Sequence, residues 1–124
     1  MNKNLCDLSL RLALKSASRY RLGAVVAKRC RVLSTGFNRP KTHPIMEKYN
    51  TSGWRKFELH AEVDCCLGLS VRDMSGAEIY VGRITKSGHQ ALAKPCEICQ
   101  RFLRSVGVEI AYFSTERGWG KIEL

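Results

Sequence analysis

Two short apolar runs separated by a helical segment constrain the fold of this chain most strongly. Ile79-Tyr80-Val81 is typical of a buried strand, and so is the run from Val108 to Phe113. Between them, Pro95 suits the first turn of a helix that runs to about Ser105. A strand, a helix and a second strand in this order predict a βαβ unit with a right-handed crossover.

The first half of the chain adds a helix and a hairpin. Residues 5–19 carry a polar stripe at spacings of three and four, which predicts an amphipathic helix. The runs Ala24-Val25-Val26-Ala27 and Arg31–Phe37 are joined by a tight basic connection, which is typical of an antiparallel hairpin. Residues 38–57 predict a long loop, and residues 61–72 a further helix. An α/β sandwich with helices on both faces is the expected closure.

The length and composition exclude several classes of protein. A chain of 124 residues has about the length of a single domain, and it can bury a hydrophobic core without disulfide bonds. With 44% hydrophobic and 26% charged residues, it is neither a disordered chain nor a coiled coil. No stretch approaches the ~18 apolar residues of a membrane span, and residues 1–20 lack the apolar core of a secretory signal. We therefore expect no membrane partner and a cytoplasmic location, where the six cysteines are reduced.

The charge is strongly basic and unevenly distributed. Residues 1–56 hold 13 basic and two acidic side chains, a net charge of +11, whereas residues 57–124 have a net charge of −1. Such a field attracts anions, including phosphate, nucleotides and nucleic acid. A solvated surface is the structural alternative. Several of the basic residues crowd the predicted long loop: Arg39, Lys41, Lys48, Arg55 and Lys56.

Two motifs at predicted helix starts contain metal-binding residues. The first is His60-Ala61-Glu62, and the second is Pro95-Cys96-Glu97-Ile98-Cys99. Cysteines three positions apart share one face of a helix, and the N-terminus of a helix favours the thiolate form. Two thiolates and one imidazole provide three zinc ligands and leave a fourth position for water. The spacing therefore predicts a catalytic Zn²⁺ held by His60, Cys96 and Cys99.

Glu62 lies two residues after the histidine, at the same helix tip. A carboxylate there can take a proton from the water and pass protons to the substrate without binding the metal. A structural zinc site with Cys30, Cys65 or Cys66 as a fourth ligand is the main alternative, but it leaves Glu62 without a role. Otherwise, those three cysteines and Cys6 are expected to be buried thiols.

The motif pair H-x-E and P-C-x-x-C is the signature of zinc-dependent deaminases. The sequence resembles the cytidine and deoxycytidylate deaminase superfamily over about residues 5–115. The resemblance rests on residues 60–64 (HAEVD), residues 95–99 (PCEIC) and Gly36-Phe37-Asn38. The segment Lys41-Thr42-His43-Pro44 looks like that of small phage deoxycytidylate deaminases. The resemblance implies a single deaminase domain over residues 1–124, a three-layer α/β/α sandwich with about five strands in a mixed sheet, and a homo-oligomer.

The resemblance also assigns roles in substrate binding. Asn38 is expected to contact the sugar of a nucleoside or nucleotide, and the backbone N–H of Ala61 to bond the carbonyl group of the base. A phosphate needs two or three cationic partners. Arg39 and Lys41, which follow Asn38, and Lys94, which precedes the second motif, are the candidates.

We therefore expect a zinc-dependent hydrolytic deaminase that converts a cytosine nucleotide, with dCMP as the first candidate, to the uracil nucleotide and ammonia. One alternative is a polynucleotide base deaminase that acts on cytosine or adenine in single-stranded DNA or RNA, which the basic charge favours. Another is a non-catalytic zinc module that binds nucleic acid. The presence of Glu62 argues against this last reading.

Overall fold

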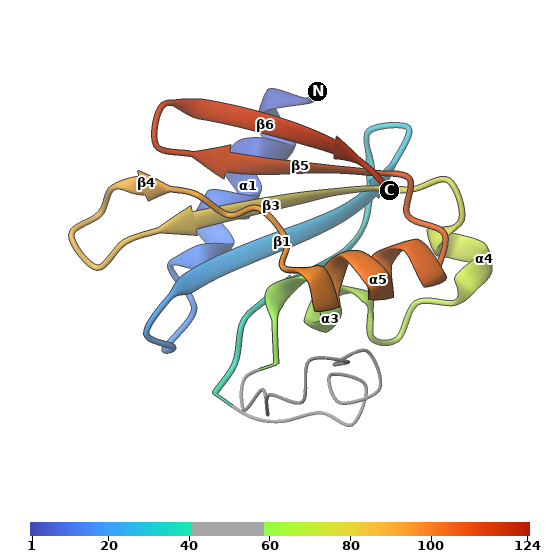
Figure 1. The fold of residues 1–124 in the computed structure, drawn as a ribbon, viewed down its shortest axis with the longest axis horizontal. Helices are drawn as coiled ribbons and strands as arrows, with labels where there is room; N and C mark the ends of the chain where they lie inside the picture. Colours follow the sequence, from blue (N-terminus) through green and yellow to red (C-terminus); the bar gives the residue numbers. More distant parts are fainter. Residues whose placement is uncertain (41–58) are drawn as a thin grey trace.

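The structure of the chain is a computed structural model that describes residues 1–40 and 59–124. Helices and strands alternate along the chain (Figure 1). In chain order they are α1 (Lys3–Ala13), β1 (Arg21–Lys28), β2 (Arg31–Phe37), α3 (Ala61–Cys66), α4 (Val71–Met74), β3 (Glu78–Ile84), β4 (Gln90–Ala91), α5 (Glu97–Ser105), β5 (Ile110–Thr115) and β6 (Gly118–Glu123).

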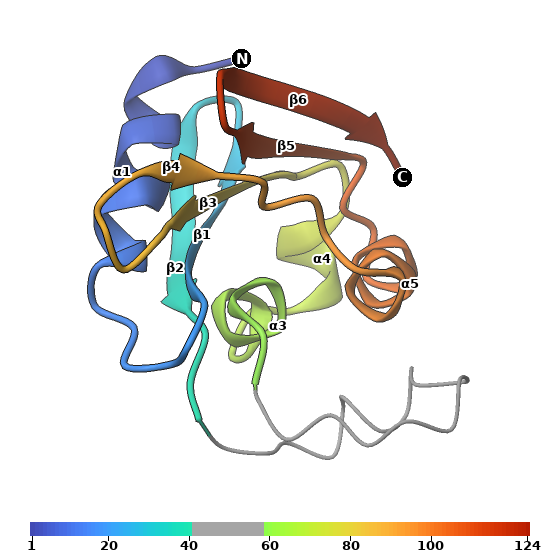
Figure 2. The same cartoon turned by 60° about the vertical axis from the view of Figure 1, so that its left-hand side comes forward.

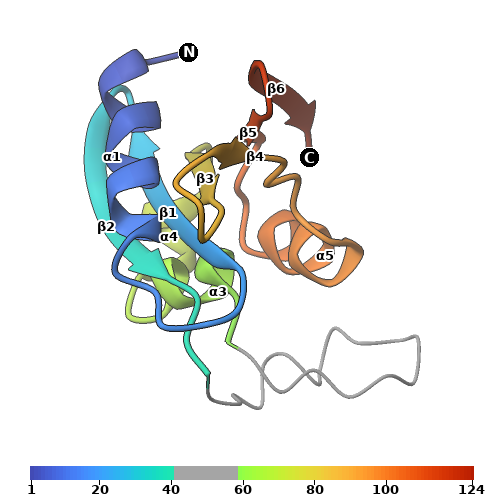
Figure 3. The same ribbon diagram turned by 90° about the vertical axis from the view of Figure 1, so that its left-hand side faces the viewer.

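The described strands form one mixed sheet in the order β2-β1-β3-β5-β6, and β4 pairs with the end of β3. Strands β3 and β5 are parallel and are joined through α5, so the βαβ unit expected from the sequence is confirmed. The other pairs are antiparallel. Helix α1 covers one face of the sheet, and α3, α4 and α5 lie against the other (Figures 2 and 3). The expected three-layer sandwich is therefore present, with six strands where about five were predicted.

The sheet separates two apolar cores, and the alternation of side chains along each strand assigns residues to them. On the face of α3 and α5, the larger core includes Val26 of β1 and Val81 of β3. On the α1 side, Val25 and Tyr80 belong to the second core. Trp119 of β6 also packs against this second core. No helix in residues 1–40 or 59–124 is both long enough and apolar enough to cross a membrane.

Three helix boundaries differ from the predictions. Helix α1 ends at Ala13 rather than near residue 19, because Ser16 turns its hydroxyl to the Asn38 carbonyl and accepts a bond from the Ser18 N–H. The predicted helix over residues 61–72 is two short helices, separated by Gly68 at a φ of 91°. At the start of α5, the N-cap is Cys96, so Pro95 precedes the helix.

Two small residues allow α1 to approach the sheet closely. Gly23 of β1 and Gly82 of β3 are paired across the two strands, under the helix. A Cβ atom at Gly23 would lie 2.3 Å from the carbonyl oxygen of Ser9 and 2.5 Å from the backbone nitrogen of Ala13. Both of these are backbone atoms of the helix, so the helix itself would have to move.

We expect Gly23→Ala to lower the free energy of unfolding by about 1–3 kcal/mol, the usual cost of overpacking. Urea denaturation followed by circular dichroism measures this. Gly118→Ala is the matched control, because a Cβ at Gly118 meets no atom within 4 Å. Equal losses in the two variants would show that the helix does not depend on the close approach.

Candidate active site

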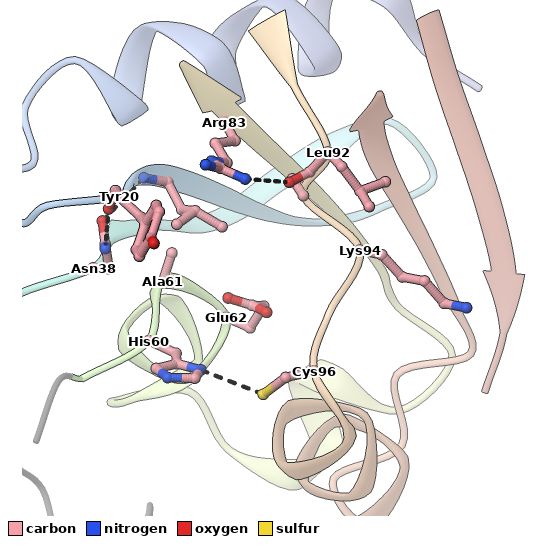
Figure 4. Close-up of a pocket in the computed structure, with 11 residues that line it drawn as sticks. Tyr20, Asn38, His60, Ala61, Glu62, Arg83, Leu92, Lys94 and Cys96 are labelled. Carbon is pink, nitrogen blue, oxygen red and sulfur yellow. Dashed lines mark hydrogen bonds between the residues drawn. The ribbon is translucent and has the colours of Figure 1, made fainter. Parts of the chain in front are cut away.

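The imidazole of His60 and the thiols of Cys96 and Cys99 meet where two helices begin. His60 is the N-cap of α3, Cys96 is the N-cap of α5, and Cys99 lies in the first turn of α5. The Nδ1 atom of His60 is 3.1 Å from Sγ of Cys99. It is 3.5 Å from Sγ of Cys96, a contact drawn in Figure 4. The three donor atoms all lie within 4.8 Å of one another.

This donor set fits zinc. Tetrahedral zinc with bonds of about 2.3 Å to sulfur and about 2.0–2.1 Å to nitrogen places its ligand atoms roughly 3.6–3.8 Å apart. The nitrogen–sulfur distances in the trio are close to these values, and two cysteines with one histidine suit this metal. Among the residues that the structure describes, this trio is the group that could hold a metal ion.

The other cysteines do not complete the trio. The Cys65 thiol donates a 3.2 Å hydrogen bond to the carbonyl oxygen of Glu62, and Cys66 packs in the larger core. Cys6 is also buried, as predicted. The expectation that Cys30 is buried is wrong, because it is exposed at the hairpin turn with a φ of 65°. All six cysteines are free thiols.

The two thiols of the trio differ in their affinity for protons. Hydrogen bonds from Cys99 and His60 lower the pKa of Cys96 to about 4, against the cost of burial. The hydrogen bond to Cys96, together with burial, raises the pKa of Cys99 well above its ordinary value. The thiolate form of Cys96 is therefore favoured, at the positive N-terminal end of α5.

Glu62 is buried beside the trio and faces a pocket. It is the second residue of α3, and 3% of its surface is exposed. Burial raises the pKa of its carboxyl group. Figure 4 shows Glu62 between the His60–Cys96 pair and the part of the pocket that Arg83 lines.

The pocket has a volume of about 460 Å³, within the range of small-molecule sites. Ala61, the first residue of α3, forms part of the wall, and its N–H has no acceptor within the helix. Segments from both halves of the chain contribute to the lining. Its residues are Tyr20, Leu22, Asn38, His60, Ala61, Glu62, Arg83, Leu92, Ala93, Lys94 and Cys96.

The buried Asn38 connects the pocket wall to β1. Its Oδ1 accepts a 3.0 Å hydrogen bond from the Leu22 N–H, and its Nδ2 donates to the carbonyl oxygen of Tyr20. Its own carbonyl oxygen accepts from the Ser16 hydroxyl at 2.9 Å. Since an amide has two N–H donors and two acceptor lone pairs, Asn38 retains capacity for a ligand. It therefore both fixes the wall and faces the pocket.

The structure describes two of the three cations expected to bind phosphate, Arg39 and Lys94, and of these two Lys94 lines the pocket. Lys94 lines the pocket, but its side chain extends away from Glu62 (Figure 4). Arg39 is not part of the lining; its Nε lies 3.2 Å from Oδ1 of Asp64, and its guanidinium lies over the ring of Phe37 at 4.5 Å. Lys41 falls outside the described residues. The same is true of His43 and of the other basic residues named in the predicted loop, Lys48, Arg55 and Lys56.

Arg83 is a pocket residue that sequence reasoning missed. It lies near the end of β3, and its Nη1 donates a 3.3 Å hydrogen bond to the carbonyl oxygen of Leu92. Its guanidinium lies over the ring of Tyr20, with Cζ 4.9 Å from the ring centroid. The alternation of side chains along a strand could have identified Arg83, because Val81 and Arg83 lie on the same face of the sheet. The predicted strand ended at Val81, two residues before Arg83, whereas β3 runs to Ile84.

The segment that carries Leu92 is fixed by Ser114 of β5. The Ser114 hydroxyl donates a 2.7 Å bond to the carbonyl oxygen of Ala91 and accepts a 3.0 Å bond from the Arg83 N–H. Its own carbonyl oxygen accepts a 2.9 Å bond from the Ala93 N–H. Strand β3 and residues 91–93 are thus held in one position.

Comparisons with known proteins agree with this architecture. No protein-family model matches the sequence, and no curated protein is similar to it in sequence. Among solved structures, the apo form of dCMP deaminase from cyanophage S-TIM5 superposes with a TM-score of 0.61 at 21% identity, over 90% of this chain and 79% of that one. The complex of that enzyme with dCMP and dUMP superposes equally well, at 19% identity, over 90% of this chain and 78% of the other.

RibD from Acinetobacter baumannii also superposes, with a TM-score of 0.51 at 19% identity, over 86% of this chain and 26% of RibD. The resemblance to the cytidine and deoxycytidylate deaminase superfamily is thereby confirmed at the level of the fold. At these identities the comparisons show the fold, and the reaction depends on the chemistry of the site.

Proposed function

We propose that this protein is a zinc-dependent hydrolytic deaminase of cytosine nucleotides, with dCMP as its first candidate substrate, and that residues 1–124 form one catalytic domain. The observation that supports this is the trio of His60, Cys96 and Cys99 at two helix N-termini, with Glu62 buried beside it and facing a pocket. A purely structural zinc site needs neither the pocket nor the carboxylate.

In this proposal, His60, Cys96 and Cys99 hold the zinc ion. Bound there, zinc would supply a water molecule activated for attack near neutral pH. Glu62 takes up the two protons of the water one after the other at its carboxylate, and passes one to the ring nitrogen and the other to the departing ammonia. Water and the cytosine nucleotide are consumed, and the uracil nucleotide and ammonia are released. Burial of Glu62 keeps bulk water from competing for these transfers.

The remaining pocket residues recognise the nucleotide. The N–H of Ala61 donates to the carbonyl group of the base, and the free capacity of Asn38 meets the sugar. Arg83 supplies a fixed guanidinium at the wall for the phosphate, and Lys94 lies at the rim. The free thiols are compatible with a reducing compartment such as the cytoplasm. A homo-oligomer stays a prediction.

An ammonia-release assay with deoxycytidine, dCMP, dAMP and a cytosine-containing oligonucleotide tests the proposal. We expect dCMP to have the highest kcat/KM. Arg83→Ala should lower the preference for dCMP over deoxycytidine by about tenfold, since a hydrogen bond to a charged group typically contributes this much. Arg104→Ala, which removes an exposed cation at the far end of α5, should leave that preference as it is.

Three results would change the proposal. Faster release from dAMP would identify adenine as the base. A faster reaction on the oligonucleotide, with a log–log salt slope of about −0.7 per phosphate contacted, would identify a polynucleotide deaminase. No ammonia from any of these compounds would remove the proposed activity.

A further inference from the structure

A second hollow adjoins the candidate active-site pocket. It has a volume of about 350 Å³ and lies where the segment before β1 meets the end of β3. Two residues, Tyr20 and Arg83, line both hollows. The other residues that line it are Arg19, Ile84, Thr85 and Lys86. The active-site pocket and this hollow therefore share a wall rather than lying on separate faces of the molecule.

The second hollow is basic. Arg19, Arg83 and Lys86 line it, and none of the described residues around it is acidic. Within residues 1–40 and 59–124, the ion pairs involve Arg39 and Arg101, so these three cations have no carboxylate partner there. Uncompensated cations in a concave surface concentrate anions.

The shared wall is preorganised. The Arg83 guanidinium is fixed by its bond to the Leu92 carbonyl oxygen and has further N–H donors, of which Nε is buried without a hydrogen-bond partner among the described residues. Tyr20 is held through its carbonyl oxygen by Asn38. The Cζ atoms of Arg83 and Arg19 lie over the Tyr20 ring, 4.9 and 5.5 Å from its centroid. Two guanidinium groups at one ring therefore concentrate positive charge beside the hollow.

From this juxtaposition we infer that the second hollow is an anion subsite for a second phosphate group of the substrate. This inference rests on the proposed function and extends it. The pocket holds the nucleoside, Arg83 contacts the first phosphate of the nucleotide, and Arg19 and Lys86 contact the next phosphate. Two kinds of ligand carry such a group: a nucleoside diphosphate, and a short strand in which the next nucleotide supplies the phosphate.

Binding measurements test the subsite without requiring turnover. Isothermal titration calorimetry at low salt in magnesium-free buffer, on zinc-loaded protein that carries Glu62→Gln so that the ligands are not turned over, gives the dissociation constants of dCMP, dCDP and the 5′-phosphorylated dinucleotide pdTpdC. We expect at least one of the two longer ligands to bind about tenfold more tightly than dCMP. The gain should shrink as salt is added. A gain with dCDP alone identifies a phosphate chain, and a gain with pdTpdC alone identifies a neighbouring nucleotide on the 5′ side.

The double variant Arg19→Ala/Lys86→Ala assigns the effect to the hollow. Its ratio of dissociation constants, dCMP over the preferred longer ligand, should fall to about one. Arg72→Ala/Lys121→Ala, added to the same Glu62→Gln protein, removes the same charge from exposed positions on α4 and β6 and should leave the ratio unchanged.

Three outcomes overturn the inference: a ratio near one in the Glu62→Gln protein, a preference that survives when Arg19→Ala/Lys86→Ala is added, or no binding of either longer ligand. The proposed function fails on a different result, the absence of ammonia release. If dCMP, dCDP and pdTpdC bind equally and ammonia is still released from dCMP by the unmodified protein, the subsite is lost and the proposed activity stands.

Discussion

Glu62→Gln is expected to reduce the turnover of the cytosine nucleotide by about 10²–10⁴-fold while the protein keeps its zinc, because general acid–base catalysis contributes on that order. Glutamine has nearly the size of glutamate and fills the same buried space, but it cannot accept and return a proton. Steady-state kinetics with dCMP, together with metal analysis of the same samples, measure both parts of the prediction.

Glu97→Gln is the matched control for the charge change. Glu97 is the first residue of α5, directly after Cys96, but it is exposed and pairs with Arg101 on the helix surface. We expect its turnover to stay close to wild type. A Glu62→Gln enzyme with near-wild-type turnover would show that another group moves the protons. Loss of zinc from that variant would show that the carboxylate supports the metal.

Cys99→Ala should lose the zinc ion and, with it, all measurable deamination. Cys99 is fully buried and lies 3.1 Å from the imidazole of His60, so alanine leaves two ligands where three are needed. Because metal bound to the folded state alone adds to stability, we also expect the thermal midpoint to fall. Metal analysis by mass spectrometry and a thermal melt measure these two effects.

Cys65→Ala separates metal loss from the cost of a cavity. Cys65 is also fully buried, but its thiol bonds to the carbonyl oxygen of Glu62 and does not join the trio. This variant should keep one zinc ion per chain despite losing some stability. If Cys99→Ala instead retained a full equivalent of zinc, the assigned ligand set would be incorrect.

Local sequence signals identified the residues of the candidate metal site and their positions at helix starts. The positions of His60 and Cys96 at helix starts follow from the short motifs, and the parallel pairing of β3 and β5 follows from their order around α5. What brings the imidazole to the thiols, however, is the packing of α3 and α5 on the same face of the sheet. The sequence supported that arrangement through the resemblance and not through spacing.

Substrate-facing residues were harder to predict because their positions depend on tertiary contacts. Arg83 lies on the pocket wall because β3 extends two residues beyond its buried run, pairs there with β4, and is fixed by Ser114. Arg39 follows Asn38 in the sequence, yet Asp64 of α3 attracts its guanidinium away from the pocket lining. Proximity in sequence was therefore a poor guide to which cation lines the site.

The residues that line the pocket come from two different groups of elements, which affects how the specificity of this enzyme can evolve. Its proposed chemistry resides on α3 and α5, whereas much of its recognition surface comes from the segment after α1 and from residues 83–94. These connecting segments are tied down by a few hydrogen bonds from Asn38 and Ser114. Surface connections of this kind tolerate substitution and insertion better than the helices and strands that they join. Selection can therefore exchange the substrate while the reaction is inherited intact.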